Sequence, residues 1–323
     1  MDRLPRTWPS SMSDRYPKRF LYVAGTSYTG STLLSLLLNL HPQIVSVGEM
    51  TGPFRGVADR SEYPCSCGAK MSECPFWTAV GEEMERRGLQ FDAEHWNLRF
   101  DPDSILRRRV LTNSLKNNFA DAVRDTAVQH APVLGKQIRE IVRRNEAVAA
   151  SACTVADAPV FVDTSKSVDR ARQLNRMSGL EPYVVHLVRD SLGFVASKKA
   201  RAWMDPEGAK IGNAMRYWNR RSAQAERLFA ALEPERRLLV RYEDLCTDPE
   251  HELGRICEMV GMAKLPGPYD FHAGDHHIIG NEMRLESSSE IVLDERWTTI
   301  LTEQEAETVR GSTSRYRRVF GYA

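Results

Sequence analysis

The chain lacks several features that would place it in other classes of protein. No apolar run approaches the roughly 20 residues that a helix needs to cross a bilayer, and the longest, residues 33–40, is interrupted by Ser35 and Asn39. Its 44 Lys and Arg residues almost balance 43 Asp and Glu, so no charge excess points to a nucleic acid or a membrane as partner. The first residues carry charges, prolines and serines without an apolar core, which argues against a secretory signal. Six cysteines without a regular spacing favour a reducing, cytoplasmic location.

Short apolar segments alternate with helical stretches along the chain, which is typical of an α/β protein. Five segments are short, buried in character and rich in Val, as parallel strands should be: residues 20–24, 44–47, 160–162, 183–188 and 238–241. We predict a three-layer, P-loop-like fold with a central parallel sheet. Residues 1–18 are predicted to form a flexible arm, and residues 19–323 a single domain. A long insertion, about residues 51–158, is expected to form a helical cap over the carboxyl edge of the sheet.

Helix boundaries follow from caps and prolines. Helices are predicted after Gly30 and ending before Pro42, from Ser191 as cap to Trp203, over 213–232, over 249–259, and from Glu303 onward; the insertion should be helical over 105–127.

A glycine-containing loop joins the first predicted strand to its helix. The loop consists of Gly25, Thr26, Ser27, Tyr28, Thr29, Gly30, Ser31 and Thr32. Strand, glycine loop and helix together form a phosphate cradle, because backbone N–H groups and the helix amino terminus point at one anion. A Walker A loop would place Lys after the second glycine, where this chain has Ser31. The missing lysine therefore argues against a nucleotide kinase of related fold. The alternative to a phosphate cradle is a plain strand-to-helix turn, which would also need two glycines.

Here the chain resembles the PAPS-dependent sulfotransferases, whose first loop carries glycine, Ser or Thr, and Thr, as in Gly30, Ser31 and Thr32. The resemblance implies that this loop holds the 5′-phosphosulfate of the donor PAPS. Many members carry Lys or Arg two residues before the glycine. That position is Tyr28 in this chain, so the source of the expected cation is open.

A second segment also resembles the family. A predicted strand ends at Arg189, and Ser197 follows about two helical turns later. The resemblance implies that these two residues hold the 3′-phosphate of PAPS, and the planar guanidinium suits phosphate oxygens. The alternative is a surface ion pair between Arg189 and the adjacent Asp190. A third match, residues 239–245, is interpreted as structural. The resemblance covers residues 20–49 and 160–260.

Two charged residues are candidates for the chemical step. Glu49 follows the second predicted strand and His41-Pro42, an arrangement similar to tyrosylprotein sulfotransferases, which implies that Glu49 is the catalytic base. Lys166 follows the third strand, where related sulfotransferases place a lysine near the bridging oxygen. The alternative for Glu49 is a surface or helix-capping glutamate, and the alternative for Lys166 is an exposed lysine in a helix cap. Sulfuryl transfer resembles phosphoryl transfer and needs a base, a cation and a rigid donor cradle, so no catalytic metal is expected.

Residues 277–284 are a candidate donor lid, by analogy with the basic loop of cytosolic sulfotransferases, and Arg284 is predicted to reach the nucleotide. A metal role for His276 and His277 is not favoured, because adjacent side chains in an extended segment point apart.

Cys65, Cys67 and Cys74 form a short cluster with three interpretations: ordinary packing, a structural zinc site with His95 as a distant fourth ligand, or a disulfide. The other cysteines, Cys153, Cys246 and Cys257, are interpreted as core residues.

The sequence therefore predicts a sulfotransferase that moves a sulfuryl group from PAPS to a hydroxyl. The acceptor, expected to enter between Glu49 and the cap, is left open among carbohydrate, lipid, phenol, peptide tyrosine and small metabolite. One alternative is a nucleotide kinase of related fold. The other is a catalytically inactive nucleotide-binding protein, and Tyr28, at a position where many relatives carry Lys or Arg, favours that alternative.

Overall fold

The structure, a computed structural model, describes residues 17–51, 59–100, 117–272, 274, 276–285 and 288–322. Residues 1–16 of the arm predicted for residues 1–18, and residues 105–116 of the helix predicted for 105–127, lie outside these ranges. Within them, no helix combines the length and the apolar character needed to span a membrane.

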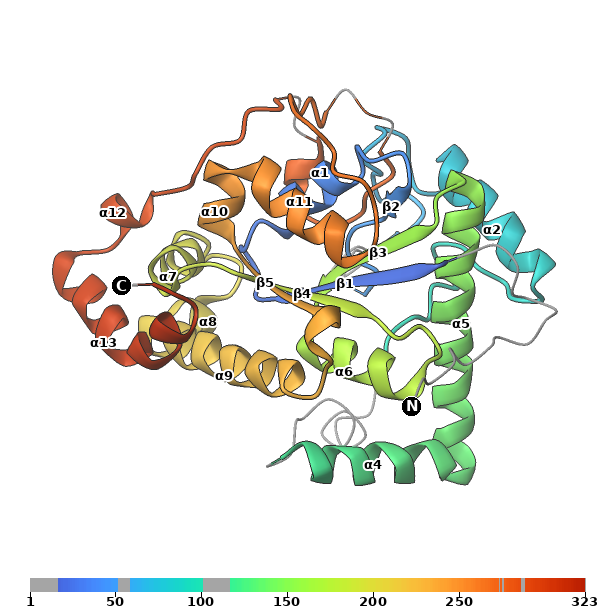
Figure 1. The fold of residues 1–323 in the computed structure, drawn as a ribbon, viewed down its shortest axis with the longest axis horizontal. Coiled ribbons are helices and arrows are strands. Elements are labelled where there is room, and N and C mark those ends of the chain that lie inside the picture. Colours follow the sequence, from blue (N-terminus) through green and yellow to red (C-terminus); the bar gives the residue numbers. More distant parts are fainter. Residues whose placement is uncertain are drawn as a thin grey trace.

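A five-stranded parallel sheet forms the centre of the molecule (Figure 1). Its order is β2 (Ile44–Ser46), β3 (Val160–Lys166), β1 (Arg19–Gly25), β4 (Tyr183–Val188) and β5 (Arg237–Arg241). All five predicted strands are confirmed, and each pairs with its neighbour in parallel. The prediction succeeds because strands covered on both faces must be apolar throughout.

Helices cover both faces of the sheet, and alternate residues of β1 show how. Leu21 and Val23 pack with the leucines of α1 (Ser31–Leu38) and with α11 (Pro249–Met259). Phe20 and Tyr22 face the other way, into a larger core with α5 (Pro132–Ala156), α6 (Val168–Met177) and α9 (Ile211–Phe229). In Figure 1, α1 and α11 lie above the sheet, with α6 and α9 below it. The predicted three-layer α/β fold is confirmed.

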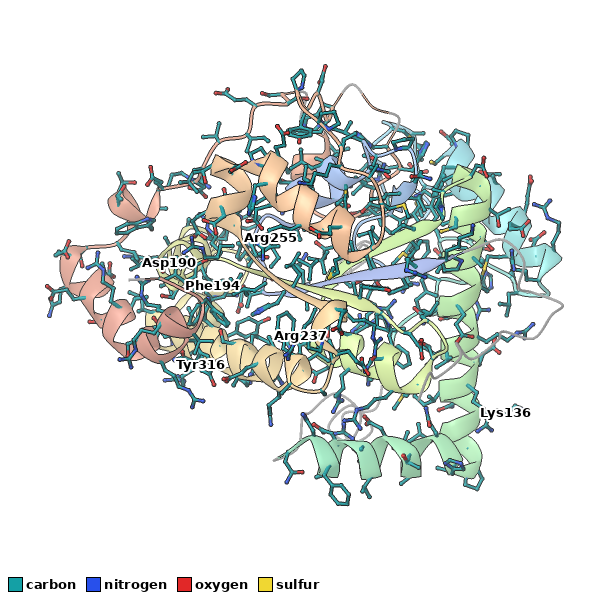
Figure 2. The ribbon with its side chains drawn as sticks, viewed as in Figure 1. Lys136, Asp190, Phe194, Arg237, Arg255 and Tyr316 are labelled. Carbon is teal, nitrogen blue, oxygen red and sulfur yellow. The ribbon has the colours of Figure 1, made fainter. Side chains whose placement is uncertain are left out.

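A third core ties the end of the chain to β4. It joins α7 (Ser191–Ala200), α9, α12 (Trp297–Ile300) and α13 (Glu303–Val319). Figure 2 shows Asp190, Phe194 and Tyr316 in this region. The helix predicted from Ser191 differs in two ways: Asp190 is its cap, accepting from the Leu192 N–H at 2.9 Å, and the helix ends at Ala200.

The short helices complete the chain: α8 (Pro206–Ala209), α10 (Tyr242–Thr247), η1 (Pro234–Arg236) and η2 (Glu282–Leu285). The helix predicted over 249–259 is confirmed as α11, and α13 begins at Glu303 as predicted.

The insertion is helical, but it does not cover the carboxyl edge of the sheet in the part that the structure describes. Its helices are α2 (Pro75–Arg86), α4 (Asn118–His130) and α5. Helix α5 packs against β2, β3, α2 and α4, and α4 contacts α6. A buried ion pair joins this layer to the sheet, because Arg170 binds Asp163 of β3 and also donates to Asn145 of α5 at 2.6 Å. The insertion thus builds one face of the core, because its apolar residues face the sheet.

Candidate active site

A cavity of about 740 Å³ lies where the carboxyl ends of the strands meet. Its lining includes Ser27, Tyr28, Gly30, Ser31, Thr32, Glu49, Lys166, Arg189, Ser197, Arg201 and Tyr242, with Gly280, Asn281 and Asp294 from later in the chain. Of the insertion's described residues, Tyr63 alone belongs to the lining. Among the described residues, the wall facing the sheet edge is therefore formed mainly by residues 280–285 and 288–296, whereas the sequence predicted the helical cap there.

The glycine loop is held tightly against its surroundings. Thr29 Oγ1 donates to Thr26 O at 2.9 Å inside the loop. A Cβ on Gly25 would lie 2.5 Å from Leu187 O, and one on Gly30 would lie 2.5 Å from the Tyr242 ring. Gly30 also has φ +78°, a left-handed conformation that favours glycine. Both glycines are thus required by close packing, which accounts for their spacing before any ligand is considered.

The amino end of α1 opens toward the cavity. Gly30 is its N-cap, no described side chain caps it, and its first turn holds no acidic residue. A helix amino terminus with free N–H groups and a positive dipole end is suited to an anion. Gly25, Thr26 and Thr29 stand behind the lining and shape the loop, whereas Ser31 and Thr32 face the cavity.

Three residues that follow different strands converge at one side of the loop. Lys166, at the end of β3, forms an ion pair with Glu49 and donates from Nζ to Ser31 Oγ at 3.3 Å. Lys166 has φ +65°, an uncommon value for a residue with a β-carbon, of the kind found at functional sites. The interpretation of Lys166 as an exposed residue is wrong, since only 14% of its side chain is exposed.

The backbone around Glu49 is fixed by the later part of the chain. Glu49 N–H donates to Ile279 O at 2.9 Å, and Ile279 N–H donates to Val47 O at 3.0 Å. Gly48, with φ +81°, leaves no room for a β-carbon, which would lie 2.0 Å from Ile279 O. Gly48 and Glu49 are thus the point where residues 276–285 join the end of β2.

Arg189 is buried at a second side of the cavity, with 5% of its surface exposed. Its guanidinium donates to Tyr28 O at 3.1 Å, to Asp294 O at 2.7 Å and to Ser197 Oγ at 3.4 Å, and stacks on the Tyr242 ring. The alternative of a surface pair between Arg189 and Asp190 is wrong. Asp190 pairs with Arg317 of α13, and Arg189 pairs with the Asp294 carboxylate at 3.1 Å.

Asp294 carries a negative charge into this part of the cavity. Hydrogen bonding from Arg296, with a smaller contribution from Arg189, holds the pKa of Asp294 well below its usual value despite partial burial. Asp294 therefore occupies one edge of the guanidinium that the sequence assigned to a phosphate.

A cation stands close to Tyr28, the position where many relatives are basic. The Arg201 guanidinium lies 4.8 Å from the centre of the Tyr28 ring, and both residues line the cavity. The sequence argument missed Arg201, because nothing local ties the end of α7 to the glycine loop. Its only signal is the basic cluster of Lys198, Lys199 and Arg201.

Arg284 lies elsewhere. It is 4% exposed and outside the cavity lining, and its guanidinium donates to Gly280 O at 2.6 Å and Pro64 O at 2.7 Å. It also stacks on the ring of Tyr63. In this structure Arg284 holds the segment beside Glu49 in place, and contact with a nucleotide stays a prediction.

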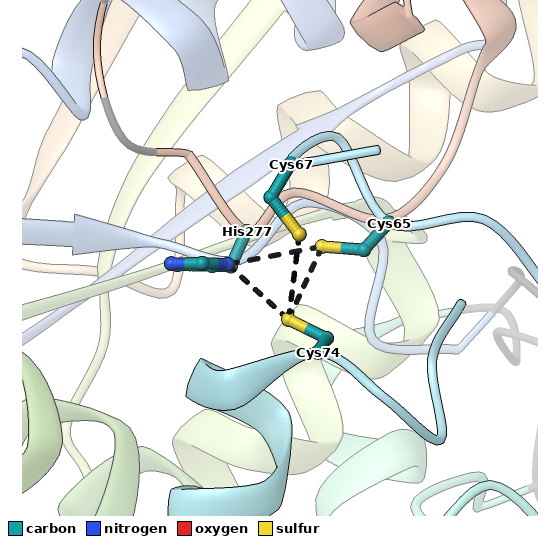
Figure 3. Close-up of side chains that lie close together, drawn as sticks. All are labelled: Cys65, Cys67, Cys74 and His277. Carbon is teal, nitrogen blue, oxygen red and sulfur yellow. Dashed lines mark hydrogen bonds between the residues drawn. The ribbon is translucent and has the colours of Figure 1, made fainter. Parts of the chain in front are cut away.

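The three cysteines of the cluster lie close together, and the histidine beside them is not the one that the zinc interpretation named. His95 pairs with Asp92 at 2.8 Å, so its assignment as the fourth ligand is wrong. The residue beside Cys65, Cys67 and Cys74 is His277, and the four ligand atoms all lie within 4.8 Å of one another (Figure 3).

Fold and site define a three-layer α/β protein with a phosphate-type glycine loop at the carboxyl edge of its sheet. The family model described as "Sulfotransferase family" matches residues 21–266, so the chain belongs to the sulfotransferase family, as its motifs suggested. No curated protein matches the chain.

Solved structures that resemble the chain include three described as sulfotransferases. The sulfotransferase domain from the curacin biosynthetic pathway is similar with a TM-score of 0.53 at 16% identity, covering 96% of this chain and 99% of that one. The sulfotransferase domain of the Synechococcus PCC 7002 olefin synthase has a TM-score of 0.47 at 19% identity, covering 98% of this chain and 99% of that one. Sulfotransferase STF9 from Mycobacterium avium has a TM-score of 0.48 at 15% identity, covering 95% of this chain and 78% of that one. At these identities the first comparison supports the fold alone.

Proposed function

We propose that this protein transfers a sulfuryl group from PAPS to a hydroxyl group of an acceptor. The observation that carries the proposal is the convergence of Glu49, Lys166 and Ser31 beside the open amino end of α1. A base, a cation and an anion cradle are the three parts that in-line transfer of a charged group requires. Three different strands supply them, so their meeting is a property of the fold.

The residues of the cavity fit a donor with phosphates at two ends. The N–H groups of the α1 amino terminus would hold the 5′-phosphosulfate. Arg189 and Ser197 would hold the 3′-phosphate, because the planar fork of N–H groups suits phosphate oxygens and the N–H groups that now bind Asp294 would be released to the ligand. Asp294 would have to leave Arg189 for a phosphate to bind there.

Glu49 and Lys166 take separate roles in the transfer. The Glu49 carboxylate accepts the proton of the attacking hydroxyl, and the Lys166 ammonium stabilises the charge that develops on the leaving phosphate oxygen. Lys166 reaches the loop at Ser31, so a cation is present there although the loop itself carries no lysine. Arg201, stacked on Tyr28, supplies a second positive charge to the same wall.

A transfer assay with two donors tests this proposal. The protein is incubated with ³⁵S-labelled PAPS and a panel of alcohols, phenols, sugars, lipids and tyrosine peptides, and in parallel with γ-³²P-labelled ATP and magnesium. We expect label transfer from PAPS to a hydroxyl acceptor, lost in Glu49→Gln. Transfer from ATP to the same panel, with none from PAPS, would establish the kinase alternative.

A further inference from the structure

The cluster of Cys65, Cys67, Cys74 and His277 has the dimensions of a metal site. Cys74 Sγ lies 3.7 Å from both Cys65 Sγ and Cys67 Sγ. His277 Nδ1 lies 3.3 Å from Cys74 Sγ and 4.0 Å from Cys65 Sγ. A tetrahedron with Zn–S bonds of about 2.3 Å and a Zn–N bond of about 2.0 Å has S–S edges of about 3.8 Å and S–N edges of about 3.5 Å. Three of these spacings lie within about 0.2 Å of those edges, and the fourth, from Cys65 Sγ to His277 Nδ1, is about 0.5 Å longer.

The other two interpretations fit less well. A disulfide needs two sulfurs about 2.0 Å apart, whereas here one sulfur is equidistant from two others. Ordinary apolar packing explains the burial of Cys65 and Cys74, but not an imidazole nitrogen that contacts both of their sulfurs with a third sulfur, on the exposed Cys67, within 4.8 Å. Figure 3 shows this arrangement, with the second ring nitrogen turned away.

The surroundings hold the four side chains in these positions. Cys65 and Cys67 flank a tight turn, in which Gly68 N–H donates to Cys65 O at 3.0 Å and Gly68 has φ +86°. Cys74 is the N-cap of α2, where the helix dipole favours a thiolate. The His277 ring stacks on Phe76 at 4.8 Å with an interplanar angle of 3°. Such outer contacts orient a ligating histidine.

We propose that Cys65, Cys67, Cys74 and His277 form a tetrahedral structural zinc site. Three thiolates and one imidazole are a ligand set that suits Zn²⁺, and four protein ligands leave no position for substrate. The site joins the start of the insertion to the segment that carries His277, about 200 residues later in the chain.

The zinc site would also hold the wall of the cavity beside Glu49. Ser66, between two of the cysteines, donates to His276 O and accepts from the Ile278 N–H, both at 2.7 Å. Ile279 then bonds to the backbone on both sides of Gly48. Zinc is therefore expected to position the backbone of Glu49 without touching substrate. This last consequence rests on the proposed function, whereas the metal site does not.

Metal content and a cobalt spectrum test the site without any activity assay. We expect about one zinc per chain in the purified protein, and intense visible absorption of tetrahedral, thiolate-bound Co²⁺ after exchange. Cys67→Ser is the most informative variant because Cys67 is exposed, so the change removes a ligand without opening the core. Its zinc content should fall at least about tenfold after dialysis against a mild chelator, whereas Cys257→Ser, a buried cysteine outside the cluster, should keep its zinc.

Three results would overturn the proposal. Six reactive thiols in the denatured wild-type protein, with neither zinc nor a tetrahedral cobalt spectrum, would mean packing only. Two fewer thiols would mean a disulfide. Zinc retained equally in Cys67→Ser and His277→Ala would place the metal elsewhere. Because PAP binding is measured separately, a protein that binds zinc but not PAP would disprove the proposed function and leave the zinc site standing.

Discussion

Exchanging Glu49 for Gln separates the proposed base from the proposed cation. Gln keeps the shape of the side chain and an oxygen that accepts from Lys166, but it cannot take a proton from the acceptor. General-base catalysis contributes about 10²–10⁴-fold, so turnover on an ordinary alcohol should fall by that factor while donor affinity is kept. Lys166→Ala should also lower turnover, through the leaving group.

Stability cannot account for a loss of that size. The ion pair is partly buried, with 14% and 22% of the two side chains exposed, so removing its charge should cost about 1–2 kcal/mol. In a chain of this length that lowers the melting temperature by only a few degrees. The folded fraction at assay temperature therefore stays near one, and differential scanning fluorimetry provides the control.

The assay compares two acceptors of similar shape that differ in hydroxyl pKa, such as phenols with and without a nitro group, and follows release of PAP. The acidic phenol needs little help from a base, so it should restore turnover in Glu49→Gln and fail to restore it in Lys166→Ala. If both variants respond alike, or if Glu49→Gln matches the parent on an ordinary alcohol, Glu49 is not the base.

Three further predictions concern the donor site and the core. Arg189→Ala should weaken PAP binding about tenfold or more by calorimetry, since a hydrogen bond to a charged group contributes about 1.5–3 kcal/mol, and unchanged affinity in the folded variant would remove Arg189 from the site. Gly30→Val should abolish PAP binding with the circular dichroism spectrum intact, because its β-carbon meets the Tyr242 ring; retained binding would mean that the loop is only a turn. Burial lowers the pKa of His186 to about 4, below the unfolded value of about 6.5. Between these two pH values the unfolded chain binds a proton at this residue and the folded chain does not. The free energy of unfolding of the wild-type protein should therefore fall by about 3 kcal/mol as the pH drops through that range. His186→Leu should remove this loss in urea unfolding at pH 7 and pH 4.5, and parallel losses in both proteins would refute it.

The sequence predicted the sheet well, because buried parallel strands have a strong local signature. β4 matches its prediction residue for residue, and the loop after β1 was found from its glycines. Local signals discriminate poorly between neighbouring polar residues. Asp190 and Ser191 both suit a helix cap, and the cap of α7 is Asp190, which also pairs with Arg317 far along the chain.

Contacts between distant segments were the main failure. Periodicity and turn residues report local conformation, so they cannot show which loops meet. Three contacts of this kind were missed, and each joins segments at least 100 residues apart. They are the contact of Arg201 with Tyr28, the ion pair of Asp294 with Arg189, and the contact of His277 with the cysteines. For the same reason the sequence placed the insertion over the strand ends, where residues 280–285 and 288–296 form most of the wall among the described residues.

Isothermal titration calorimetry with PAP, in buffer without added metal, against ATP with magnesium tests the central claim most directly, because it requires no knowledge of the acceptor. The account predicts that PAP binds at a single site without added metal, more tightly than ATP with magnesium, and that Arg189→Ala weakens this binding. Tight binding of ATP with magnesium together with no heat from PAP would contradict it.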